Sequence, residues 1–190
     1  MNVSFRSVAV WMCGLAAWIA TSAAAAPQAV GSFDGVTWRS LQASLDRPTA
    51  VVFSTTDCVH CPAAIEALAR EIRRRKWMTG ERAIGTRATG KRATGKRAAE
   101  LVVVVMDRAP GDDDARLMRD AHYRAADRLF AFSGQGAALR YSVNPDWRGV
   151  TPFVAFLVPG APPVWVAGLP SETDMANWVK AASLAQRTAR

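Results

Sequence analysis

The chain has 190 residues, of which half are hydrophobic and 21% are charged, and its formal net charge is +8 at pH 7. This length and apolar content suit one globular domain with a sizeable core, and they exclude a chain that is disordered throughout. The charge is uneven, because residues 70–97 hold eleven Lys or Arg against two Glu, a local balance of +9 that leaves about −1 elsewhere. The high isoelectric point therefore belongs to one segment of the chain.

Residues 1–25 have the pattern of a secretory signal peptide. Arg6 supplies a positive charge, residues 8–20 form an apolar run, and small residues for cleavage follow it. Cleavage there would export residues 26–190 as one mature domain. An uncleaved membrane anchor is the alternative, but the run is short for a helix that spans a bilayer. Lipid attachment at Cys13 is disfavoured because no small residue directly precedes that cysteine.

Hydrophobic periodicity and turn residues predict the elements of the mature chain in order. In the first half these are a loop at 31–35, a helix at 37–46, a strand at 50–54, a helix at 58–77 and a strand at 101–106. In the second half they are a helix at 112–129, a short helix at 137–141, strands at 153–158 and 163–167 that form a hairpin, and a last helix capped by Ser171.

The apolar residues of the helix at 58–77 form one stripe, since Ile65, Leu68 and Ile72 recur at helical spacing. The runs before and after it are rich in β-branched residues, which is typical of buried strands. A helix that joins two such strands is a βαβ unit. We therefore expect the strands at 50–54 and 101–106 to be parallel and central.

Residues 79–98 are four copies of one five-residue unit, each with a glycine and at least one basic residue. A period of five matches neither a helix nor a strand, and the unit has no apolar face to bury. The sequence therefore predicts a disordered basic insertion. One interpretation is that it touches anionic surfaces or an acidic partner, and the other is an expanded loop with no task. Nucleic acid is not expected as a partner of an exported chain.

Without the signal segment, Cys58 and Cys61 are the only cysteines. Cys58 is expected at a helix N-terminus, where free N–H groups and the helix dipole favour a thiolate. His60 would add to this effect, and Asp57 would oppose it unless it points to solvent. The pair can cycle between dithiol and disulfide, bind a metal or form a permanent clip, although closing so short a loop stabilises a fold little.

Thr151-Pro152 directly precedes a predicted strand. A proline at the start of a central strand is unusual, and a cis peptide bond explains it well. Such a bond would leave the Thr151 carbonyl and N–H free to pair with an extended substrate. The alternative is a trans proline that begins the strand.

These features resemble the thioredoxin fold, and more narrowly the exported thioredoxin-like thiol:disulfide oxidoreductases of bacteria. The residues that carry the resemblance are Cys58-Val59-His60-Cys61, Arg148-Gly149-Val150-Thr151-Pro152, the hairpin that ends in Gly168, and the helix after it. The resemblance covers the mature chain except the insertion. It implies an α/β three-layer fold, with a central mixed β-sheet flanked by helices.

The resemblance also implies roles for single residues. Cys58 is expected as the nucleophile, Cys61 as the resolving cysteine, and Val59 and His60 as the pair that tunes the redox potential. Thr151 and Pro152 are expected to bind the substrate. The implied substrates are protein thiols or disulfides. The signal peptide predicts a periplasmic location, where a membrane or periplasmic redox partner is expected, and no motif in the sequence predicts a cofactor or a metal.

Departures from the family pattern leave the direction of electron flow open. Val52 stands where thioredoxin has a buried carboxylate, and Asp57 stands where it has tryptophan. A histidine before the second cysteine, here His60, is similar to the oxidising disulfide-forming enzymes. The compact layout is instead similar to the membrane-associated reductases, so the two signals conflict.

Two other classes of function remain as alternatives. A copper metallochaperone would bind Cu(I) through Cys58 and Cys61, with His60 or His122 as a third ligand. The copper-delivery proteins of this fold have three residues between their cysteines, however, whereas this chain has two. A binding module without redox activity has little support while both cysteines are present.

Overall fold

The computed structural model describes residues 27–80 and 99–188, without the side chains of 75–80 and 188. Its strands are β1 (Val30–Phe33), β2 (Thr49–Ser54), β3 (Glu100–Val105), β4 (Arg128–Phe132), β5 (Phe153–Leu157) and β6 (Val164–Ala167). Its helices are α1 (Gly35–Ala43), α2 (Cys61–Gly80), α3 (Asp114–Arg119), α4 (Gly136–Val143) and α5 (Glu172–Thr188). The predicted signal peptide and residues 81–98 of the predicted insertion lie outside the described residues.

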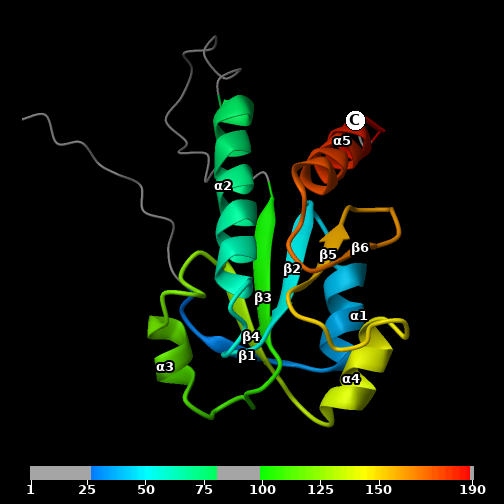
Figure 1. The fold of residues 1–190 in the computed structure, drawn as a ribbon. Coiled ribbons are helices and arrows are strands. Elements are labelled where there is room, and N and C mark those ends of the chain that lie inside the picture. The colour runs from blue at the N-terminus through cyan, green and yellow to red at the C-terminus, as the bar shows by residue number, and fades with distance from the viewer. Residues whose placement is uncertain (1–26, 81–98, 189–190) are drawn as a thin grey trace, which may run out of the picture.

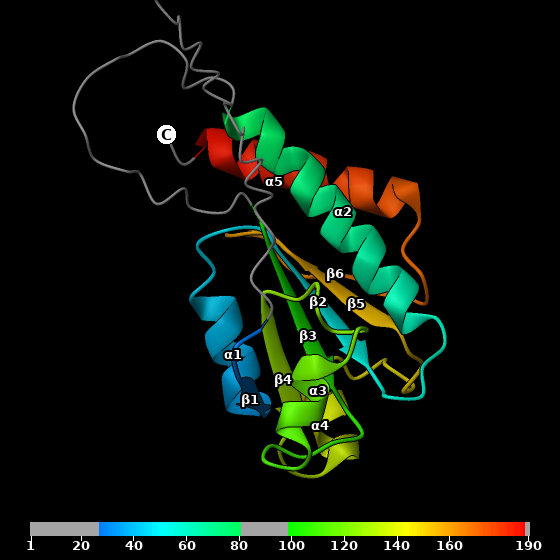
Figure 2. The ribbon, with the colours of Figure 1, turned by 90° about the vertical axis from the view of Figure 1, so that its left-hand side faces the viewer.

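The six strands form one mixed sheet in the order β1-β4-β3-β2-β5-β6. The first four strands of that order pair in parallel, whereas β5 is antiparallel to β2 and to β6. Strands β2 and β3 are therefore the predicted parallel βαβ pair, and β5 and β6 are the predicted hairpin. Helices lie on both faces of the sheet (Figures 1 and 2). The α/β three-layer arrangement expected for a thioredoxin-like fold is confirmed.

Each face of the sheet has its own hydrophobic core. On one face, α2 buries its predicted stripe, and Trp178 of α5 packs into the same cluster. On the other face, Trp38 and Leu41 of α1 meet Leu139 and Val143 of α4. All residues of β2 and all but the first of β3 are buried, because both faces of these central strands are covered.

The prediction of one helix over 112–129 was wrong. Only α3 is helical there; turns follow it, and the chain then enters the sheet as β4. The chain leaves helical geometry at Asp120, whose backbone is extended. Leu129, which the sequence pattern placed at the end of this helix, and Ala131, which lies beyond it, are buried in β4 between β1 and β3.

The loop predicted at 31–35 was also wrong, because most of it is strand β1. Its pairing with β4 places Gly31 opposite Phe130. A Cβ atom on Gly31 would lie 2.7 Å from the Phe130 ring, so the missing side chain makes room for that ring. A glycine that weakens a strand by propensity is thus required by a contact that is distant in sequence.

Two further predictions concern helix ends. The cap of the last helix is confirmed, since Ser171 and Asp174 exchange hydrogen bonds before α5. Helix α2 begins at Cys61, three residues later than predicted, and it ends with Thr79 and Gly80, the first two residues of the predicted insertion. Among the described residues, none of the helices combines the length and the apolar character needed to cross a membrane.

Candidate active site

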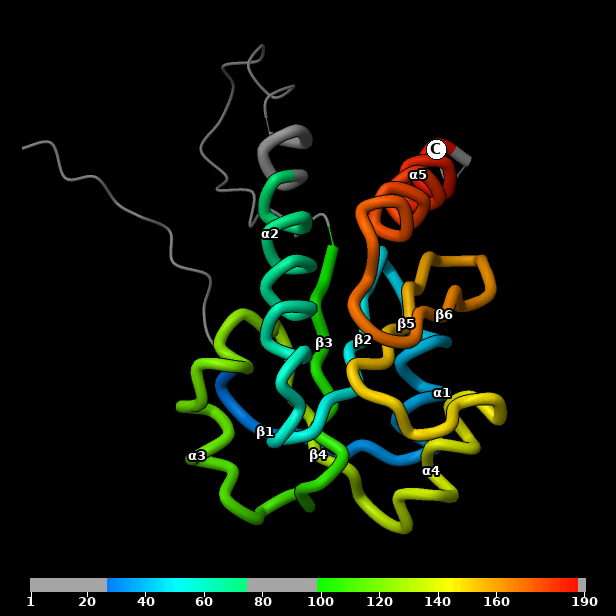
Figure 3. The backbone as a smooth tube through the Cα atoms, viewed as in Figure 1, coloured from blue at the N-terminus to red at the C-terminus, as the bar shows by residue number. Residues whose placement is uncertain are grey.

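The register of the sheet brings three chain segments together where β2 and β3 end. Ser54 of β2 pairs with Val105 of β3, and Phe53 pairs with Phe153, the first residue of β5. The segment that leads from β2 to Cys58 therefore leaves the sheet beside the residues that follow β3 and those that precede β5. Figure 3 shows these segments meeting near the N-terminal end of α2.

Cys58 and Cys61 are joined by a disulfide bond in this segment. Cys61 is the first residue of α2 and is 1% exposed, whereas Cys58 lies in the preceding turn and is partly exposed. The Cys61 N–H donates to the Cys58 carbonyl at 3.3 Å, and the first helical bond of α2 joins the Ala64 N–H to the His60 carbonyl at 3.2 Å. Only one of the two cysteines is thus open to an external partner.

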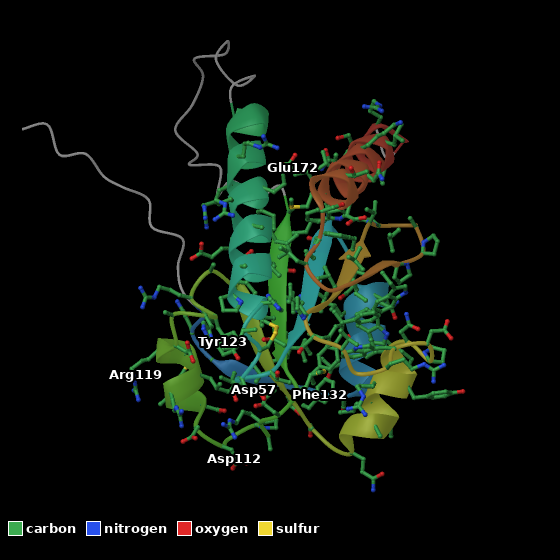
Figure 4. All side chains as sticks on the ribbon, in the orientation of Figure 1. Asp57, Asp112, Arg119, Tyr123, Phe132 and Glu172 are labelled. Atoms are coloured by element: carbon green, nitrogen blue, oxygen red, sulfur yellow. A yellow bond between two sulfur atoms is a disulfide. The ribbon has the colours of Figure 1, made fainter. Side chains whose placement is uncertain are left out.

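The residues around Cys58 in the chain face solvent. Val59 is 81% exposed, and His60 and Asp57 are exposed as well. An exposed Asp57 meets the condition under which the helix N-terminus, rather than this carboxylate, dominates the environment of the Cys58 sulfur. Figure 4 shows Asp57 near the end of α2, where the disulfide appears in yellow.

The peptide bond between Thr151 and Pro152 is cis, the conformation predicted for it. Pro152 is buried and Thr151 is partly exposed. The Pro152 carbonyl accepts a hydrogen bond from the Gly168 N–H at 2.8 Å, which ties it to the end of β6. The Trp147 indole N–H donates to the Val150 carbonyl at 2.9 Å. The segment that carries Thr151 is therefore held on both sides.

Sequence reasoning missed Trp147. Its ring stacks on Phe153, with the centroids 4.6 Å apart and the planes at 9°, and it lies 4.8 Å from Phe53. One side chain thus joins β2, β5 and the turn before Thr151. A lone tryptophan in a segment without periodicity gives no sign of these partners, although its N–H does require an acceptor when buried.

Sequence reasoning also missed Asp107 and Tyr123, which both bind the segment before Cys58. The Thr56 N–H donates to both carboxylate oxygens of Asp107, at 3.0 and 3.1 Å. The Tyr123 hydroxyl lies 3.5 Å from the Thr55 carbonyl, which also accepts the Cys58 N–H at 3.3 Å. The sequence points to Asp107 only if the β2–β3 register is assumed. Tyr123 was not considered because the sequence placed it in the helix predicted at 112–129, which does not extend to this residue.

Tyr123 is fully buried, and burial raises the pKa of its hydroxyl to about 12. A hydrogen bond with Ser54 opposes this shift. The carboxylates of Asp107 and Asp120 raise the pKa further, and the Arg108 cation lowers it. The neutral hydroxyl is thus the form that the fold stabilises.

We expect Tyr123 to make the fold sensitive to alkali. In the unfolded chain a tyrosine loses its proton at about pH 10, so the contribution of Tyr123 to stability is complete below that pH and is lost as the pH rises toward 12. The free energy of unfolding should fall by about 2 kcal/mol over this range through this group. Urea unfolding at several alkaline pH values gives the free energy of unfolding of the wild type and of Tyr123→Phe as a function of pH. If the free energy of unfolding falls equally with pH in the two proteins, Tyr123 is not the cause and the expectation is contradicted.

Of the two histidines considered as metal ligands, His60 is exposed beside Cys58 and His122 lies in the turns after α3 rather than in the predicted helix. The His122 Nδ1 atom is 3.8 Å from a carboxylate oxygen of Asp120. Among the residues that the structure describes, no group of three or more His, Cys, Asp or Glu side chains is arranged to hold a metal ion.

No protein-family model matches the chain, and no curated protein matches its sequence. Among solved structures, it is similar to a secreted disulfide oxidoreductase of Mycobacterium tuberculosis, with 16% identity and a TM-score of 0.45 over 75% of this chain and 85% of the other. It is similar to the thioredoxin domain of a thiol-disulfide oxidoreductase from Bacteroides vulgatus, with 12% identity and a TM-score of 0.46 over 83% and 94%.

A thioredoxin-family thiol:disulfide interchange protein from Chlorobium tepidum is 12% identical, with a TM-score of 0.46 over 86% of this chain and 99% of the other. Similarity this distant does not assign a function to the chain. The function has to follow from the geometry of the chain's own residues.

Proposed function

We propose that this protein is a thiol:disulfide oxidoreductase that exchanges disulfides with protein cysteines through Cys58 and Cys61. One observation carries the proposal. The disulfide joins a partly exposed cysteine to a cysteine that is 1% exposed, at the junction of a central strand and a helix. A sulfur atom of a substrate can reach Cys58, whereas the buried Cys61 can react only with Cys58.

The reaction follows from this difference in exposure. In the reduced protein, the Cys58 thiolate attacks one sulfur of a substrate disulfide and releases the other as a thiolate, which takes up a proton. The Cys61 thiolate then attacks the Cys58 sulfur and displaces the second substrate sulfur. Two electrons and two protons pass to the substrate, and the Cys58–Cys61 bond forms. In the opposite direction a substrate thiolate attacks Cys58, and Cys61 is the leaving group.

The surface around Cys58 suits a polypeptide substrate. Val59, Val150 and Leu169 are 81%, 54% and 55% exposed, and each is adjacent in the chain to a residue of the site. Only Val59 is next to the reactive sulfur in the chain, whereas Val150 and Leu169 flank the segment that carries Thr151 and the end of β6. We assign substrate binding to Thr151 and Pro152. The carbonyls of Val150 and Pro152, on either side of Thr151, are each held by a hydrogen bond within the protein.

The N-terminal sequence supports the periplasm as the site of this activity, since an oxidising exported compartment permits a disulfide cycle. The substrates proposed there are protein thiols or disulfides, and the pair is regenerated by a membrane or periplasmic redox partner. The direction of transfer depends on the potential of the Cys58–Cys61 pair against that of its partners.

Equilibration of the pair with reduced and oxidised glutathione tests the proposal, with and without Cu(I). The proposal expects a reversible two-electron transition, and a high or low potential then assigns the oxidase or the reductase direction. Tight stoichiometric copper binding that persists without any exchange activity would instead support the metallochaperone and contradict the enzyme.

We expect His60→Ala to raise the pKa of the Cys58 thiol and to make the pair more reducing. An imidazole beside the sulfur stabilises the thiolate, and stabilising the reduced form makes a disulfide a better oxidant. The rate of alkylation by iodoacetamide against pH measures the thiol pKa. His122→Ala is the matched control, because it removes the other histidine. An unchanged titration in His60→Ala would exclude a tuning role for His60.

A further inference from the structure

In the segment between β2 and Cys58, the side-chain hydrogen bonds of Thr56 go to residues far away in the sequence. The β2–β3 pairing continues past both strands, because the Met106 N–H donates to the Ser54 carbonyl at 2.9 Å. This places Asp107 beside Thr56. The Thr56 backbone N–H and hydroxyl both donate to the Asp107 carboxylate.

Arg108, the next residue in the chain, also contacts Thr56. One of its guanidinium nitrogens donates to the Thr56 hydroxyl oxygen at 3.4 Å. An anion and a cation therefore both touch Thr56, the anion through several hydrogen bonds and the cation through one long one. The carboxylate is the closer and better held of the two charges.

Thr56 is two residues before Cys58, so their Cα atoms are at most about 7 Å apart. The Asp107 carboxylate, which is hydrogen-bonded to Thr56, therefore lies on the order of 10 Å from the Cys58 sulfur, and near the protein surface a fixed charge at that separation changes the balance between thiol and thiolate measurably. The other charged side chains on the segments that meet here are Asp57 and His60 beside Cys58, Asp146 and Arg148 before Thr151, and Asp120 near Tyr123. Asp107 and Arg108 differ from them in being hydrogen-bonded to the segment itself.

We propose that Asp107 and Arg108 are positioning residues that act on Cys58 through Thr56, with the Asp107 carboxylate opposing the thiolate and Arg108 favouring it. The Asp107 carboxylate therefore makes the Cys58–Cys61 pair more reducing than the helix N-terminus and His60 would make it. This inference rests on the proposed exchange function for its meaning, but it concerns a property of the Cys58 sulfur that is measured without any substrate protein.

The test compares Asp107→Asn, Arg108→Gln and the control Asp112→Asn. Asp112 is an exposed aspartate of the same connecting segment, and Figure 4 shows it well away from the disulfide. We expect Asp107→Asn to lower the pKa of the Cys58 thiol by about half a unit and Arg108→Gln to raise it, with Asp112→Asn unchanged. Alkylation rates of the reduced protein against pH give these values.

The potential provides a second measurement. At a pH above the thiol pKa, Asp107→Asn should shift the equilibrium with glutathione about threefold toward the reduced protein, or about 14 mV. Asp107→Glu, which keeps the charge, should behave like the wild type.

Shifts of the wrong sign would overturn the inference. So would equal shifts in Asp107→Asn and Asp112→Asn, or a lower stability with an unchanged thiol pKa, since these indicate an overall charge effect or a purely structural residue. If Asp107→Asn does not fold, the rise in the Cys58 thiol pKa expected for Arg108→Gln still tests the inference. If the wild type exchanges no disulfides but the alkylation shifts occur, the proposed function fails and this inference stands.

Discussion

Cys58→Ser should reduce thiol–disulfide exchange to the uncatalysed rate, whereas Cys61→Ser should still react once and then accumulate a mixed disulfide with its substrate. The reason is the exposure of the two residues, since Cys58 is partly exposed and Cys61 is 1% exposed in the first turn of α2. Without Cys61, no internal thiolate displaces the bound substrate. Reduction of a model protein disulfide measures the activity, and intact mass under non-reducing conditions detects the mixed disulfide.

The two variants control each other, because each keeps one cysteine of the pair and removes one sulfur atom. Tryptic mapping of the trapped species from Cys61→Ser should locate the bond at Cys58. A mixed disulfide that forms in Cys58→Ser instead would reverse the assigned roles. Turnover in both variants would show that the exchange does not proceed through this pair.

Trp147→Ala should destabilise the fold by about 3–5 kcal/mol, the cost typical of removing a large buried aromatic side chain. Trp147 is 6% exposed and its ring packs against both Phe53 and Phe153. Trp147→Phe should keep most of this packing and lose the hydrogen bond to the Val150 carbonyl, at a cost of about 1–2 kcal/mol. Urea unfolding of the oxidised proteins measures both.

Tyr141→Ala is the control for this pair, because Tyr141 is also aromatic but is 71% exposed, and its removal should change stability by at most about 0.5 kcal/mol. A loss below about 1 kcal/mol in Trp147→Ala would contradict the structural role given to this ring. If Trp147→Phe folds stably but binds a substrate disulfide more weakly, the hydrogen bond to Val150 also orders the segment that carries Thr151.

The parts of the fold that local patterns specify were predicted well. The stripe of α2, the buried runs of β2 and β3, the β5–β6 hairpin and the Ser171 cap each depend on residues a few positions apart. Periodicity and turn chemistry report such neighbours directly. The errors at β1 and β4 have the opposite origin, because these two strands pair with each other across almost 100 residues.

The sequence by itself determined the chemistry: two cysteines at a spacing that lets them bond, at the start of an amphipathic helix that follows a buried strand. It also indicated a cis peptide bond between Thr151 and Pro152, because a proline stands where a central strand begins. Only the tertiary structure decided what surrounds Cys58. Asp107 is 51 residues from Thr56, and Tyr123 is 68 residues from Thr55. Their contacts depend on the register of β2 against β3 and on the path from β3 to β4, which no short stretch of sequence encodes.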